Sequence, residues 1–144
     1  MNRTLHPVFS SAATEAAASY GNVERAIGQE WIVDAFGCDA KALADLDGLR
    51  KFLEALIADL GLQALAAGIW HRFPSPGGVT GMYLLAESHL TCHTWPEHGV
   101  AAFNLFCCRP RPAGDWDARL REALGATHVE VRCIDRARRK EARP

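Results

Sequence analysis

Residues 80–108 read TGMYLLAESHLTCHTWPEHGVAAFNLFCC, and this stretch decides the fold. Two apolar runs, MYLLA and VAAFNLFCC, flank a polar centre that begins at Glu87–Ser88. Proline and glycine mark a turn at Pro96–Gly99, just before the second run. The stretch therefore predicts a β-hairpin that carries a Glu–Ser peptide bond, two histidines and a pair of cysteines.

Strand alternation divides these side chains between the two faces of the predicted sheet. One face receives Ser88, Leu90 and Cys92, and the other receives His89, Thr91 and His93. The polar residues therefore cannot all belong to one solvated face.

The segments before the hairpin predict a strand and a helix. Segment 30–36, EWIVDAF, alternates in the manner of a strand, and 37–46 is expected to be a connection. Apolar residues then recur at helical spacing and predict a helix over 49–60 that Gly61 ends. The stripe consists of Leu49, Phe52, Leu53, Leu56, Ile57 and Leu60.

Three further elements complete the prediction. Segment 63–73 predicts a strand, which the sequence PSPGG at 74–78 ends. Beyond the hairpin, 116–124 predicts a short helix and 128–133 alternates as a last strand. Since the strands come in runs and the helices are few, we expect an α+β fold, a two-layer sandwich with helices packed on one face of a mainly antiparallel sheet.

The composition is that of an ordinary globular protein. The chain has 144 residues, 49% hydrophobic and 23% charged, with a net charge of −1. This balance carries no nucleic-acid or membrane signature, and no run of about 18 apolar residues predicts a membrane span. The alanine-rich N-terminal segment lacks the compact apolar core of a signal peptide.

We expect one domain over 28–135, with a segment on either side of it. Residues 1–27, which include a possible helix at 14–20, are expected to be mobile or peripheral. The tail, 136–144, has four arginines and one lysine against one glutamate. It fits either a solvated terminus or a contact with a polyanion.

The cysteines favour a reducing compartment. They are odd in number and lack Cys-x-x-Cys spacing, which predicts free thiols and a cytoplasmic location. No metal site is expected from the histidines and cysteines of the hairpin, because residues four apart on a strand lie about 13 Å from each other. The five cysteines are Cys38, Cys92, Cys107, Cys108 and Cys133.

The hairpin resembles the processing and active-site region of the prokaryotic S-adenosylmethionine decarboxylase proenzymes. The family pattern is Gly-Val-Ser-Gly, then Glu-Ser-His, His-Thr-Trp-Pro-Glu and a later cysteine. This chain reads GVTGMYLLAESHLTCHTWPEHGVAAFNLFCC over 78–108. A weaker resemblance, through GQEWIVDAFGCDAKAL and HRFPSPGG, extends from Gly28 to Asp135.

The resemblance implies that the chain makes its own cofactor, a pyruvoyl group derived from Ser88. Ser88 Oγ attacks the carbonyl of Glu87 and converts the amide to an ester, a step that needs an oxyanion donor and a proton carrier. His93 matches the family's proton carrier, and Thr80 stands where a serine usually assists processing. Elimination of the ester and loss of ammonia leave the ketone, and the chain is cut between Glu87 and Ser88.

The resemblance also implies how the ketone is used. It forms a Schiff base with the substrate amine and takes up the electrons left when carbon dioxide departs. Cys108 is the proton donor by motif position, whereas we assign Cys107 to packing. Phe73 resembles the aromatic residue that stacks on adenine, and Glu97 resembles the carboxylate that binds the ribose hydroxyls. His71 is expected to be structural.

Four positions depart from the family pattern. Gln29 and Glu30 replace a common Arg–His pair, Asn104 stands where an acidic residue is frequent, and Arg109 replaces a usual glycine. These departures bear on the identity of the substrate more than on the class of reaction.

Three functions remain as hypotheses. The first is a self-processing, pyruvoyl-dependent decarboxylase of S-adenosylmethionine, which supplies decarboxylated S-adenosylmethionine for spermidine synthesis. The second is a diverged decarboxylase of ornithine or arginine, and the third is a non-catalytic relative that binds a ligand. The resemblance implies a homodimer of processed protomers, and the composition predicts no nucleic-acid or membrane partner.

Overall fold

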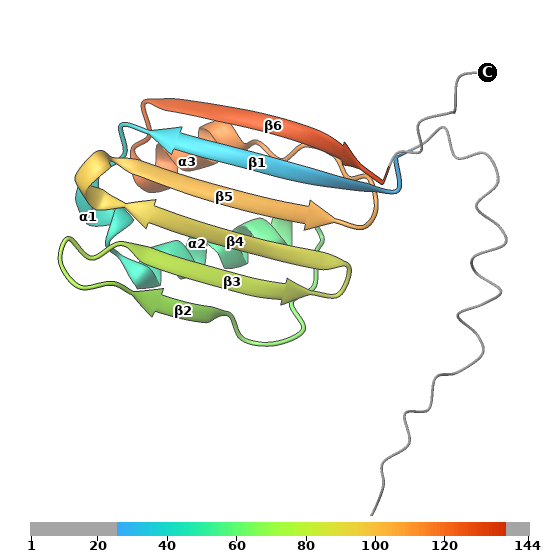
Figure 1. The fold of residues 1–144 in the computed structure, drawn as a ribbon, viewed down its shortest axis with the longest axis horizontal. Helices are drawn as coiled ribbons and strands as arrows, with labels where there is room; N and C mark the ends of the chain where they lie inside the picture. Colours follow the sequence, from blue (N-terminus) through green and yellow to red (C-terminus); the bar gives the residue numbers. More distant parts are fainter. Residues whose placement is uncertain (1–25, 138–144) are drawn as a thin grey trace, which may run out of the picture.

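The computed structural model describes residues 26–137, which form one sheet and a layer of helices (Figure 1). The strands are β1 (Gly28–Phe36), β2 (Ile69–Arg72), β3 (Val79–Leu85), β4 (Ser88–Trp95), β5 (Val100–Cys107) and β6 (His128–Arg136). The helices are α1 (Ala40–Leu43), α2 (Leu46–Asp59) and α3 (Trp116–Leu124), with a 3₁₀ turn η3 (Pro96–His98). The possible helix at 14–20 lies outside the described residues.

All neighbouring strands are antiparallel, and their order across the sheet is β2-β3-β4-β5-β1-β6. Strands β2 to β5 follow one another as a meander, whereas β1 lies between β5 and β6. The described helices lie on one face of the sheet (Figure 1). The predicted α+β two-layer sandwich is therefore confirmed.

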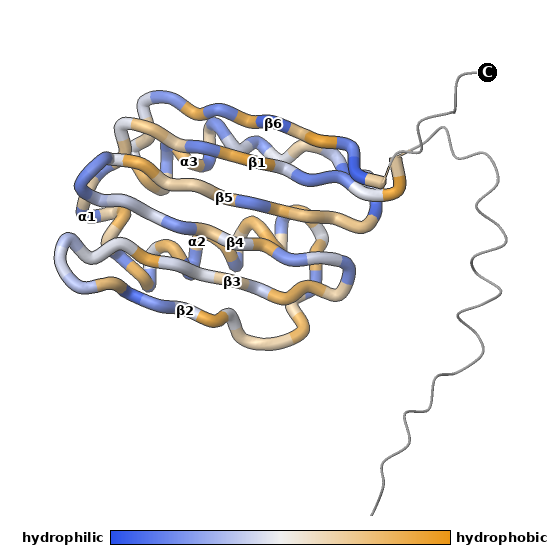
Figure 2. The backbone as a smooth tube through the Cα atoms, viewed as in Figure 1, coloured by the Kyte–Doolittle hydropathy of each residue, from blue (hydrophilic) through white to orange (hydrophobic). Residues whose placement is uncertain are grey.

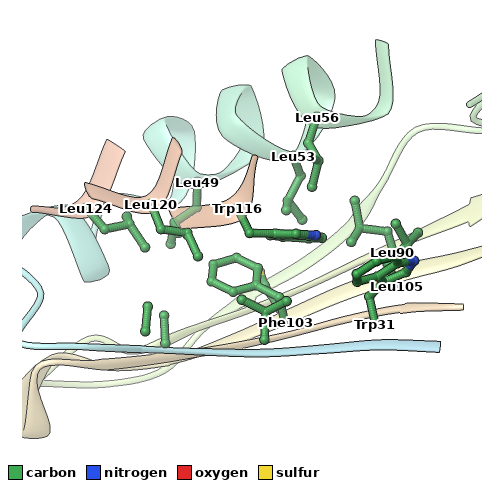
Figure 3. Packing of buried hydrophobic residues seen from close by; sticks show 14 of the residues in the cluster. Trp31, Leu49, Leu53, Leu56, Leu90, Phe103, Leu105, Trp116, Leu120 and Leu124 are labelled. Carbon is green, nitrogen blue, oxygen red and sulfur yellow. The ribbon is translucent and has the colours of Figure 1, made fainter. Parts of the chain in front are cut away.

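The core fills the space between the helices and the inner face of the sheet (Figure 3). Every second residue of β5 is buried, as expected of a strand with one face on the core. Figure 2 shows that the strand is mostly hydrophobic with one hydrophilic band, and Asn104 is its one polar residue. The ring of Phe103 lies 6.0 Å from that of Trp116 in α3 and 5.6 Å from that of Phe52 in α2. Burial of each such side chain contributes about 1.5–3 kcal/mol. Helices α2 and α3 contribute Leu49, Leu53, Leu56, Leu120 and Leu124.

Two predicted segments differ from the structure. The connection expected over 37–46 contains α1, which Asp39 caps by accepting a hydrogen bond from Ala42 N–H, and α2 begins within it. The strand expected over 63–73 is reduced to Ile69–Arg72, with an isolated bridge between Ala64 and Leu85. The alanine- and glycine-rich residues before β2 offer little side-chain surface to pack on a sheet edge, so they run as a loop.

The other face of the sheet has no described helix on it (Figure 1). We call it the uncovered face. It exposes large apolar side chains, with Met82 48% and Leu84 61% exposed. Apolar groups that gather on one open surface are typical of an interaction site.

Candidate active site

The predicted cleavage site lies in a tight turn between β3 and β4. Ala86 and Glu87 form the turn, and Leu85 pairs with Ser88 across it. Ser88 lies on the helix-covered face with Leu90, as the alternation predicts. Its Oγ is buried and has no hydrogen-bond partner among the described residues. A buried polar group without a partner costs about 1–3 kcal/mol.

The carbonyl of Glu87 has a polarising donor. The backbone N–H of Cys108 donates a hydrogen bond to this oxygen at 3.1 Å. Such a donor stabilises the negative charge that develops when a nucleophile adds to a carbonyl. The predicted nucleophile and an oxyanion donor thus lie at the same turn.

The two cysteines after Phe106 face opposite ways. Cys107 is fully buried and is the direct partner of Ser88 in the β4–β5 pair, whereas Cys108 is exposed. Burial raises the pKa of the Cys107 thiol. The burial of Cys107 agrees with a packing role. Ser88 nevertheless shares a face with Cys107 and not with Cys108, whose role as proton donor stays a prediction.

The Glu87 side chain is held by Arg111, a residue that sequence reasoning missed. Arg111 Nη2 lies 2.7 Å from Glu87 Oε2, and Arg109 Nη1 lies 4.0 Å from Oε1. The hydrogen bond from Arg111 lowers the pKa of the Glu87 carboxyl, and the charge of Arg109 lowers it further. The only signal in the sequence is the RPRP run at 109–112, which predicts a break in the sheet and says nothing of a partner.

A second group of predicted residues surrounds His93 on the uncovered face. His93 Nδ1 lies 2.6 Å from Thr80 Oγ1, its direct partner in the β3–β4 pair. The His93 ring centroid lies 5.5 Å from that of Phe73 and 4.3 Å from that of Trp95. His71 packs edge-on against Phe73, which fits a structural role. A hollow of about 240 Å³ is lined by Phe73, Pro74, Pro76, Gly78, His93, Thr94, Trp95 and Glu97.

The two groups are far apart within one chain. Ser88 and His93 are five residues apart on β4, which places them about 17 Å from each other along the strand. An odd separation also places them on opposite faces. The structure brings together Thr80, His93, Phe73 and Glu97, and separately Glu87, Ser88 and Cys108.

The departures from the family pattern make contacts of their own. Asn104 Nδ2 donates a hydrogen bond to Glu30 Oε1 at 2.7 Å. That bond lowers the pKa of the Glu30 carboxyl, and Arg136 lowers it further. Gln29 Oε1 accepts a hydrogen bond from the backbone N–H of Arg111 at 3.0 Å. Glu30 and Asn104 are therefore a coupled pair, and Gln29 belongs to the surroundings of the Glu87 turn.

Within residues 26–137, no three His, Cys, Asp or Glu side chains lie close enough to hold a metal ion. The five cysteines are free thiols. None of the helices in this part of the chain combines the length and the apolar character that a membrane span requires.

Comparison with known proteins points in one direction. The family model described as S-adenosylmethionine decarboxylase matches residues 29–137. The S-adenosylmethionine decarboxylase proenzyme of Pyrococcus abyssi is 46% identical over 83 residues, which are 57% of this chain and 58% of that protein. The matched segment thus spans less than two thirds of that relative. The proenzyme of Pyrococcus horikoshii is 38% identical over 122 residues, which are 81% of this chain and 84% of that protein.

A solved structure shares the fold. The crystal structure of the adenosylmethionine decarboxylase from Aquifex aeolicus superposes with a TM-score of 0.64 at 25% sequence identity. The match covers 83% of this chain and 98% of that chain.

Proposed function

Because this chain belongs to the S-adenosylmethionine decarboxylase family, we propose that it is a proenzyme that cleaves itself between Glu87 and Ser88 and then decarboxylates S-adenosylmethionine. One observation carries the proposal: the Ser88 hydroxyl is buried without a partner, next to a carbonyl that the Cys108 N–H polarises. Since most buried polar side-chain atoms have a hydrogen-bond partner, an orphaned hydroxyl at this motif supports a role in chemistry.

Cleavage begins with an acyl shift within the turn. Ser88 Oγ adds to the carbonyl carbon of Glu87, the carbon–nitrogen bond breaks, and an ester replaces the amide. The Cys108 N–H stabilises the oxyanion of the tetrahedral intermediate. A group must also take the hydroxyl proton and deliver a proton to the departing nitrogen. We assign this transfer to His93, which Thr80 orients.

The ester is then eliminated. Loss of the α-proton of residue 88 breaks the bond between Cβ and Oγ, and Glu87 leaves as a carboxylate. The remaining enamine rearranges, takes up water and loses ammonia, so that a ketone stands where Ser88 was. This pyruvoyl group supplies a sink for the electrons released with carbon dioxide.

The other predicted residues bind and protonate the substrate. Cys108 Sγ is the proton source for the carbon that loses carbon dioxide. Phe73 stacks on the adenine, and Glu97 accepts hydrogen bonds from the ribose hydroxyls. Both residues line the hollow of about 240 Å³. A complete ligand site usually measures about 300–1,000 Å³, so this hollow fits one part of the substrate.

A second copy of the chain completes each site. Ser88 and His93 lie too far apart in one chain to share a proton, so His93 must act on another molecule. If two uncovered faces pack about a twofold axis that runs across the strands, the end of one sheet that carries Cys108 and the β3–β4 turn meets the His93 end of the other. The Ser88 side chain, which lies on the helix-covered face, must then turn toward the interface for this transfer. The same packing buries the exposed Met82 and Leu84. A further hollow of about 420 Å³ on this face, with Ile32 in its lining, offers room for side chains of the partner.

The product is an aminopropyl donor, and we propose that it serves spermidine synthesis in the cytoplasm, where the five free thiols stay reduced. No feature of residues 26–137 favours ornithine or arginine as the substrate, and none favours a non-catalytic role.

Two measurements test the proposal. Intact mass of the purified protein should give fragments 1–87 and 88–144, with a carbonyl reagent adding to the second. Carboxyl-labelled S-adenosylmethionine should release labelled carbon dioxide, whereas ornithine and arginine should not. A single uncut chain would refute self-processing, and release from ornithine or arginine alone would refute the assigned substrate.

A further inference from the structure

We propose that Arg111 is a positioning residue for self-cleavage. It holds the Glu87 side chain so that the Glu87 carbonyl stays on the Cys108 N–H, within reach of Ser88 Oγ. This inference rests on the proposed self-cleavage and names a residue that the family motif does not contain.

Arg111 joins two other parts of the fold to the turn. Its Nη2 donates to Glu87 Oε2 at 2.7 Å, and its Nη1 donates to the carbonyl of Leu60, just beyond α2, at 3.2 Å. Its backbone N–H donates to Gln29 Oε1, in β1, at 3.0 Å. The Arg111 side chain is only 26% exposed. The guanidinium is therefore held at two points and the backbone at a third, and a planar, anchored donor loses less freedom when it binds a carboxylate than an exposed one.

Two hydrogen bonds hold Glu87, and both come from one short segment of the chain. Cys108 holds the main-chain carbonyl of Glu87, and Arg111, three residues later, holds the carboxylate. With both ends of the residue held, the turn cannot rotate the carbonyl away from the Ser88 hydroxyl. An acyl shift between neighbouring residues depends on such alignment of the reacting atoms.

The positive charge also suits the leaving group. Elimination of the ester releases the α-carboxylate of Glu87, so a second negative charge forms on the residue that Arg111 already holds. A fixed cation beside a developing anion stabilises it. Arg109 contributes less, because it lies 4.0 Å from Glu87 and its side chain is 75% exposed.

The test measures self-cleavage in timed cell-free synthesis, with the uncut and cut chains separated by mass. Arg111→Gln is expected to slow cleavage about tenfold, and Arg111→Lys, which keeps the charge, to recover part of the loss. Arg119→Gln is the matched control. Arg119 forms a 2.7 Å ion pair with Asp59 at the end of α2, near Leu60, and does not contact the turn. It is expected to stay within about twofold of wild type.

A second readout separates positioning from general damage to the fold. Decarboxylation is measured per mole of carbonyl titrated in the cut protein, and thermal midpoints are measured for every uncut variant. For Arg111→Gln we expect slow cleavage but a turnover per carbonyl within about threefold of wild type. In the double variant with Glu87→Gln, the two losses should not add, since both substitutions remove the same contact.

Four results would decide between these outcomes. Cleavage of Arg111→Gln at the wild-type rate would overturn the role of Arg111 and leave the proposed function standing. Equal slowing of Arg111→Gln and Arg119→Gln, with equal loss of thermal stability, would also overturn it. If Arg111→Gln does not fold, Arg111→Lys decides alone, and wild-type cleavage in that variant would count against the proposal. A wild-type chain that never cleaves would instead refute the proposed function itself.

Discussion

Thr80 Oγ1 and His93 Nδ1 lie 2.6 Å apart across the β3–β4 pair, on the uncovered face of the sheet. This contact fixes the plane of the imidazole ring and leaves Nε2 as its other proton-carrying atom. The His93 imidazole, held in this orientation, can transfer a proton to or from a group that lies against the uncovered face.

We expect the rate of self-cleavage to depend on the Thr80 hydroxyl and not on its methyl group. Thr80→Ser should cleave within about threefold of the wild-type rate, whereas Thr80→Val, which keeps the shape but cannot hydrogen-bond, should be at least about tenfold slower. His93→Ala should be slower still, by about 10²–10⁴. Timed intact-mass measurements check the series, and wild-type cleavage by Thr80→Val would rule out the orienting role.

Ser88→Ala should remain one chain and show no decarboxylation. It removes a buried hydroxyl that lacks a partner, so its free energy of unfolding should equal that of the uncut His93→Ala precursor or exceed it by up to about 1–3 kcal/mol. Urea unfolding of the two uncut variants gives this difference. A markedly less stable Ser88→Ala would mean that the hydroxyl has a structural partner in solution.

Substitutions at Cys108 and Cys107 are expected to affect decarboxylation differently. Cys108→Ala should still cleave, because its backbone N–H is kept, yet lose decarboxylation by about 10²–10⁴. Cys107→Ser, the control at the buried neighbour, should keep turnover per carbonyl within a few fold although it destabilises the core. Since Ser88 lies opposite Cys107 in the β4–β5 pair, the reverse result would reassign the proton donor to Cys107.

Two defective chains should repair each other. In a mixed dimer, the His93→Ala chain provides an intact Ser88 and the Ser88→Ala chain provides an intact His93. Co-expression of equal amounts should therefore cut up to about half of the His93→Ala chains and none of the others. Mass spectrometry of the mixture reads this directly. The absence of cutting in a mixture shown to contain mixed dimers would mean that His93 acts within its own chain.

Thr94 is expected to be a stability residue. It is 1% exposed, accepts a hydrogen bond from Val79 N–H at 2.9 Å and donates one to the Leu43 carbonyl at 2.7 Å. Thr94→Val keeps the volume but removes both bonds, which should cost about 1–3 kcal/mol in urea unfolding. Thr91→Val, at a half-buried position of the same strand, should change stability by less than about 0.5 kcal/mol.

Local patterns were enough to predict most of the architecture. The apolar stripe from Leu49 to Leu60 became the buried side of α2, and the alternation of β4 placed Ser88 and His93 on opposite faces as predicted. The same patterns failed at 63–68, where the sequence QALAAG is mostly small residues and lacks the β-branched and aromatic side chains that favour a strand.

The contacts around the cleavage turn were beyond the reach of such patterns. Arg111 meets Glu87 and Gln29 only because the segment after β5 folds back between the turn and β1. Neither helical nor strand periodicity encodes that path, since it depends on pairs of residues far apart in the sequence. The distance between Ser88 and His93 was implicit in the strand geometry, although the family motif assigns both residues to the same processing reaction.

The order of the strands has a consequence for the cut protein. A break between Glu87 and Ser88 assigns β1, β2 and β3 to one fragment and β4, β5 and β6 to the other. The fragments interleave, because they meet at β3–β4, at β5–β1 and at β1–β6. Neither fragment can dissociate without breaking strand pairs within the sheet. Once denaturant has separated the fragments, refolding requires two molecules to associate, so dilution lowers the yield. If the chain cleaves itself as proposed, the precursor folds as one molecule, whereas the cut protein can refold only when its two fragments meet in solution.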